Sequence, residues 1–76
     1  MPETISRDDL VKQLGASMGH EKALDAIQSA AGHLHIRGEE FDRDQTMRIL
    51  DQLSATPGLV GTVARFAKAR VILKFG

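Results

Sequence analysis

Apolar residues recur along the first half of the chain with the spacing of amphipathic helices. In the first segment of this kind they are Leu10, Val11, Leu14 and Met18. Residues three or four positions apart lie on one face of a helix, so this pattern predicts a helix with one buried side. Ser6 and Asp9 have the spacing of a capping box at its start, and Gly19 is a typical C-terminal stop. We therefore expect a helix over residues 7–18.

The clearest amphipathic pattern follows in the segment HEKALDAIQSAAGHLHI, residues 20–36. Its apolar positions fall within about 120° of one another on a helical wheel. They are Ala23, Leu24, Ile27, Ala30, Ala31 and Leu34. Because alanine carries little bulk, a neighbouring helix can approach this face closely. Gly38 is expected to mark the turn that ends the second helix.

A third apolar stripe begins after the acidic turn GEEFDRD, with Asp42 and Gln45 at capping-box spacing. The stripe consists of Thr46, Ile49, Leu50 and Leu53. Thr56 followed by Pro57 then has the pattern of an N-cap and the first residue of a fourth helix. The third helix is therefore expected to end near Ala55.

These segments predict an all-α fold, a compact four-helix domain with short connections and a largely apolar C-terminal helix. Residues 1–76 are expected to form a single helical domain, because no strand alternation, internal repeat or long linker interrupts the pattern. A chain of 76 residues with 42% hydrophobic content is small for one self-sufficient core. It has no cysteine, so neither a disulfide nor a thiolate metal site can add stability. A partner chain is the remaining source that we consider.

The segment from Pro57 to Gly76 is apolar around more than half of its circumference if Leu59 to Phe75 form one helix. Its first apolar side, which we expect to form core, holds Leu59, Val63, Phe66 and Leu73. The adjacent second side holds Val60, Ala64, Ala67, Val71 and Phe75. Such a helix can be central, with three short amphipathic helices wrapped around it. Burying Ile72 together with both sides would be difficult in a four-helix monomer, so the alternative is that the second side is an interaction surface.

Charge also sets this segment apart. The chain has zero net charge, but residues 1–55 carry six basic and ten acidic groups, whereas residues 56–76 carry four basic groups and no acid. We expect a protein partner, or a second copy in a homodimer, to contact the second side and its basic margin. The residues expected to bind it are Val60, Ala64, Arg65, Lys68, Val71, Ile72 and Phe75.

The alternative function is binding of nucleic acid or another anionic surface through the basic residues of this helix. These are Arg65, Lys68, Arg70 and Lys74. The zero net charge argues against a general nucleic-acid binder. The segment LVKQLGASMGHEKALDAIQ has the outline of a helix-turn-helix, but Glu21 and Asp25 near the start of its second helix would repel DNA.

The sequence does not support a metal site or a catalytic centre. On a helix His33 and His35 would point about 200° apart, so they could not share an ion. The stretch from Asp42 begins like a calcium loop, but Met47 and Leu53 stand where that loop needs glycine and glutamate. No glycine-rich phosphate loop or Ser/His/acid arrangement is present. We expect no enzyme activity, no cofactor and no bound metal.

Features of export are also missing from the sequence. The stretch MPETISRDD has neither the basic nor the apolar region of a signal peptide, and no run of about 18 apolar residues occurs. We expect a cytoplasmic protein without a membrane span. Its expected function is that of a regulatory or scaffolding module for protein–protein interaction or dimerisation.

Overall fold

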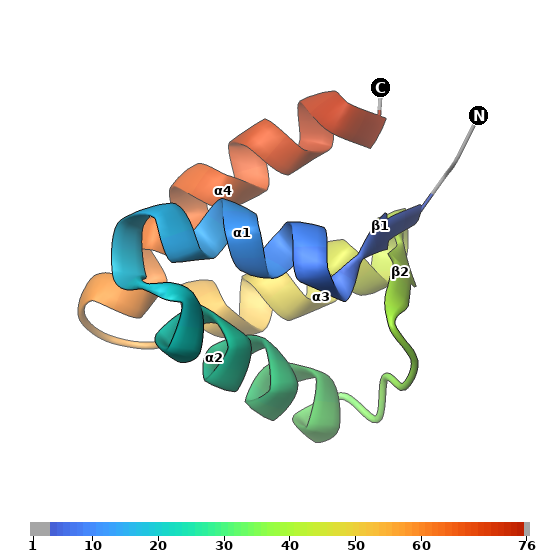
Figure 1. Ribbon diagram of the computed structural model, residues 1–76, viewed down its shortest axis with the longest axis horizontal. Coiled ribbons are helices and arrows are strands. Elements are labelled where there is room, and N and C mark those ends of the chain that lie inside the picture. The colour runs from blue at the N-terminus through green and yellow to red at the C-terminus, as the bar shows by residue number, and fades with distance from the viewer. Residues whose placement is uncertain (1–3, 76) are drawn as a thin grey trace.

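The computed structural model describes residues 4–75, and for Lys74 and Phe75 it describes the backbone alone. Within this range the chain forms four helices and two short strands in the order β1-α1-α2-β2-α3-α4 (Figure 1). Their bounds are β1 Thr4–Ser6, α1 Arg7–Met18, α2 His20–His33, β2 Glu40–Asp42, α3 Arg43–Ser54 and α4 Leu59–Phe75. The prediction of a compact helical domain is confirmed, and the strand pair is an element that it lacked.

The helix ends that local side chains determine lie where the sequence predicts them. The hydroxyl of Ser6 accepts a hydrogen bond from the backbone N–H of Asp9 at 3.1 Å and caps α1. Gly19, with φ of +93°, ends α1 and directly precedes α2. The Asp42 carboxylate accepts from the Gln45 N–H at 2.7 Å, and the Gln45 side-chain oxygen accepts from the Asp42 N–H at 3.0 Å. This reciprocal capping box starts α3.

The start of α4 differs from the prediction. Thr56 and Pro57 lie in the loop before the helix, so neither is its N-cap or first residue. The helix instead begins after Gly58, whose φ of +88° lies in the region that glycine adopts most readily. The Gly58 carbonyl accepts from both the N–H and the hydroxyl of Thr62, each at 3.3 Å. A Cβ atom at Gly61 would lie 2.0 Å from the Thr56 carbonyl oxygen, so the loop packs directly on this turn of α4.

A short antiparallel strand pair joins the two halves of the chain. Ile5 pairs with Phe41, and both side chains are buried. The flanking pairs are Thr4 with Asp42 and Ser6 with Glu40. The prediction that no strand occurs was wrong, because strands of three residues carry one buried side chain each and leave no alternating pattern.

The strand pair also relates two units of the same design, each a strand followed by two helices. The first helix of each unit has 12 residues and is capped by the last residue of its strand, Ser6 or Asp42. Packing follows the same pattern: α1 packs on α2 and α3 on α4 within the units, while α1 meets α4 and α2 meets α3 between them. The two units therefore pack in corresponding ways, a correspondence that was not predicted from the sequence.

The core lies between the four helices, and α4 contributes to it mainly the side that was expected to contact a partner. The buried apolar residues of α4 are Ala64, Ala67 and Val71 from that side and Val63 from the first side. Leu59, Phe66 and Leu73, which were expected inside, are 56%, 68% and 81% exposed. The assignment to the core was therefore wrong for these three residues, whereas Val63 of the same side is buried as expected. Small alanine side chains let α4 lie close to its neighbours, whereas the larger Phe66 and Leu59 would hold the helix away from them.

Candidate interaction surface

The outer side of α4 carries a line of exposed apolar residues. Leu59, Phe66 and Leu73 follow one another at intervals of seven residues. An α-helix drifts only about 20° over seven residues, so their side chains lie nearly in register along the helix. Thr62 and Ala69, both small and exposed, stand between them. We call these five residues the outer strip.

No other described element covers the outer strip. In Figure 1, α4 lies along one edge of the bundle, with α1 and α3 on its inner side and no other ribbon beyond it. The described side chains of α4, residues 59–73, therefore divide into an inner, buried side and an outer, exposed side. The outer strip belongs entirely to the second.

A recess adjoins the outer strip where the end of α1 approaches α4. It is lined by Ser17 of α1 and by Phe66, Ala69 and Arg70 of α4, and its volume is about 460 Å³. The recess is broadly open to solvent, so it is a shallow hollow beside Phe66 and not an enclosed pocket. A side chain of a bound molecule could enter it next to the Phe66 ring.

Two arginines border the outer strip. On the helical wheel Arg65 falls on one margin of the strip and Arg70 on the other, and both are exposed. Neither forms an ion pair among the described side chains. Lys68 differs, since it turns toward α3 and forms an ion pair with Asp51. The outer strip thus has a basic group on each side, and α4 contains no acid.

The residues predicted to bind a partner do not form one exposed surface. Ala64 and Val71 are fully buried, and Val60 is half-buried against the core. Arg65 and Ile72 are exposed on the outer side of α4. Lys68 is half-buried in its ion pair, and the side chain of Phe75 lies outside the described residues. The large residues of the outer strip were missed, although their seven-residue spacing is visible in the sequence.

The four predicted anion-binding residues are also separated. Arg65 and Arg70 lie on opposite margins of the outer strip, and Lys68 is paired with Asp51. The side chain of Lys74 is outside the described part of the chain. The described side chains therefore include no basic cluster on α4.

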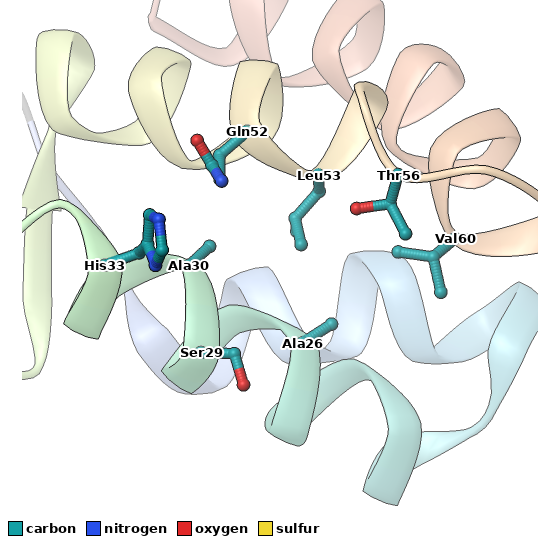
Figure 2. A pocket seen from close by; sticks show the side chains of 8 residues that line it. All are labelled: Ala26, Ser29, Ala30, His33, Gln52, Leu53, Thr56 and Val60. Carbon is teal, nitrogen blue, oxygen red and sulfur yellow. The ribbon is translucent and has the colours of Figure 1, made fainter.

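A second hollow lies between α2 and α3, with a volume of about 270 Å³ (Figure 2). Its lining consists of Ala26, Ser29, Ala30, His33, Gln52, Leu53, Thr56 and Val60. In Figure 2, His33, Ala30 and Gln52 lie at one end of the hollow and Thr56 and Val60 at the other, with Leu53 between them. Among the hydrogen bonds of the described residues, none joins His33 to Ser29. The nucleophile–base contact of covalent catalysis is therefore not formed here.

The two hollows occupy equivalent places in the two β-α-α units, since each lies between the second helix of one unit and the end of the first helix of the other. The inner positions of α2 and α4 match in their spacing as Ala23 with Val60, Ile27 with Ala64, and Ala30 with Ala67. With this alignment the exposed residues Lys22, Asp25 and Ser29 of α2 correspond to Leu59, Thr62 and Phe66 of α4. At these three positions α2 is therefore polar, whereas α4 has the two large apolar residues Leu59 and Phe66.

Neither a metal-binding cluster nor a membrane-spanning helix occurs in the described part of the chain. Within residues 4–75 no group of three or more histidine, cysteine, aspartate or glutamate side chains is placed to hold a metal ion. In the same range no helix has the length and apolar character needed to cross a membrane. Comparisons of the chain with protein-family models, with curated proteins and with solved structures found no match.

Proposed function

We propose that this chain is a non-enzymatic docking module that binds another protein through the outer strip of α4, as part of a regulatory or scaffolding system. The observation that supports this most is the exposure of Leu59, Phe66 and Leu73 in one line on a helix whose other side forms the core. Contiguous exposed apolar residues with a polar border are typical of interaction sites. The residues of α2 that match Leu59, Thr62 and Phe66 in spacing are polar, so apolar character at these positions is particular to α4.

The outer strip has enough unburied area to contribute substantially to binding. Complete burial of a leucine or phenylalanine side chain contributes about 1.5–3 kcal/mol. Because Phe66 and Leu73 are 68% and 81% exposed, most of this free energy remains to be gained. A partner that covers both would gain about 2–4 kcal/mol from them, which is about 30-fold to 1000-fold in affinity.

The structure favours this function over the binding of an anionic surface. Binding to phosphates depends on several basic side chains acting together. Lys68 is paired with Asp51, and the outer strip separates Arg65 from Arg70. Arg65 and Arg70 thus lie on the margins of the outer strip and do not form one basic cluster.

A pair of double variants tests the proposal. Phe66→Gln with Leu73→Gln removes the apolar surface, and glutamine has a helix propensity close to that of leucine. Lys22→Gln with Ser29→Gln changes exposed positions of α2 and serves as the matched control. Wild-type protein and both variants are compared by sedimentation equilibrium and by quantitative affinity capture from native lysate. Each captured protein is then purified and titrated against all three.

We expect the control to bind as the wild type does and the strip variant to lose at least about 30-fold in affinity. Circular dichroism and thermal melting verify that both variants are folded. If the strip variant retains the same partners, the same affinities and the same mass in solution as the wild type, the outer strip is not a docking surface.

A further inference from the structure

The charges beside the outer strip make a second copy of this chain a less favourable partner than a protein with acidic residues. With seven-residue spacing, Arg65 and Arg70 occupy the two positions that flank the contact line between paired helices. In a parallel pair of α4 helices Arg65 would face Arg70 of the other copy. In an antiparallel pair each arginine would face its own counterpart. Both arrangements place like charges opposite each other, which disfavours self-pairing through this strip.

We propose that the outer strip binds an amphipathic helix of another protein, with apolar residues three and four positions apart along one side and aspartate or glutamate on its margins. This inference rests on the proposed docking function and specifies the chemistry of the partner. Carboxylates on the margins of that helix would lie opposite Arg65 and Arg70. They would find no competing acid on α4 itself.

The shape of the surface supports a helical ligand. Leu59 and Leu73 are separated by about 21 Å along the helix axis, the length of about four helical turns. Thr62 and Ala69 are small, so they leave gaps between the large residues in which side chains of a second helix can insert. The recess beside Phe66, lined also by Ser17, would accept the largest of these side chains.

An extended peptide fits this surface less well. Recognition of an extended strand depends on backbone hydrogen bonds along a free sheet edge. The strands of the described structure, β1 and β2, are three residues long and pair with each other. All backbone groups in the middle of α4 are used within the helix. Side-chain packing is therefore the available mode of binding.

A display library tests the inference. The probes are helical peptides of about 18 residues with leucine at the contact positions, and glutamate, glutamine or lysine varied at the margins. Wild-type protein is one bait, Arg65→Glu with Arg70→Glu is the second, and Phe66→Gln with Leu73→Gln is the third. All substituted residues are exposed, and each bait is checked for native helix content and a cooperative melt.

We expect glutamate margins to be enriched on the wild type, lysine margins on the charge-reversed bait, and no peptide on the strip variant. The selected glutamate peptide should bind the wild type about tenfold more tightly than its lysine counterpart at low salt. This difference should shrink toward zero at about 0.5 M salt, where exposed charges are screened.

Three outcomes would overturn the inference. Enrichment of glutamine or lysine margins on the wild type, with no binding to the strip variant, would reject acidic margins and leave the docking function intact. A homodimer that Phe66→Gln disrupts would show that the surface binds a second copy of the chain. Strip-dependent binding of DNA or anionic vesicles, with no binding of any peptide, would likewise assign the surface to a different occupant. Equal enrichment of peptides on the wild type and the strip variant would reject the docking function as well.

Discussion

Alanine substitution at two nearby positions of α4 distinguishes its inner side from its outer side. Val71 is fully buried and Leu73 is 81% exposed, although only one residue separates them in the chain. Val71→Ala removes two buried carbon atoms, worth about 1.6 kcal/mol, and leaves a cavity that adds to this loss. Alanine has the higher helix propensity, which returns about 0.5 kcal/mol. The expected net loss in the free energy of unfolding is about 2 kcal/mol.

Leu73→Ala removes three carbon atoms from a residue of which only about a fifth of the surface is buried. The corresponding loss is about 0.5 kcal/mol or less. Thermal melting followed by far-UV circular dichroism measures both changes, since 1 kcal/mol shifts the Tm of a domain of this size by about 4–8 °C. We expect Val71→Ala to lower the Tm by about 8–16 °C and Leu73→Ala by less than about 4 °C. A larger loss for Leu73→Ala than for Val71→Ala would refute the division of α4 into an inner and an outer side.

Two further predictions concern backbone sites. Gly61→Ala should cost at least about 2 kcal/mol in urea denaturation, because its Cβ would lie 2.0 Å from the Thr56 carbonyl oxygen. Gly32→Ala is the matched control and is expected to stabilise the domain by about 0.5 kcal/mol. No other atom lies within 4 Å of a Cβ placed at Gly32, and alanine favours a helix. Equal effects at both glycines would contradict the close packing of the loop. Asp42→Ala should cost about 1 kcal/mol through loss of the bond to the Gln45 N–H, whereas Asp42→Ser should retain most of the stability; equal losses for both would show that this cap is not stabilising.

The sequence predicts features that depend on neighbouring residues in the chain. The span of α1 and the start of α3 follow from short-range signals, namely Ser6 with Asp9 and Asp42 with Gln45. The start of α4 was not predicted correctly, because the Thr56-Pro57 pattern indicated a helix start at those residues. The helix instead begins after Gly58, whose positive φ lets the loop fold back onto the first turns of the helix.

The sides of α4 could not be assigned from the helical wheel, since both are apolar. Their assignment depends on side-chain size, because Ala64 and Ala67 allow a close approach that Phe66 would prevent. The same ambiguity affected the candidate site. Arg65 and Ile72 were predicted at the surface and are exposed, but the apolar residues predicted beside them, such as Ala64, pack inside the domain. Only the packing of the neighbouring helices distinguishes these alternatives.

The docking function proposed for the outer strip of α4 is tested most directly by an amide chemical-shift titration. Isotope-labelled protein is titrated with the selected glutamate peptide. We predict the largest shifts along the outer strip and at Ser17 beside the recess, with little change at Ser29 and Gln52 in the hollow between α2 and α3. Saturating shifts centred on Ser29 and Gln52, with the outer strip unchanged, would contradict the account.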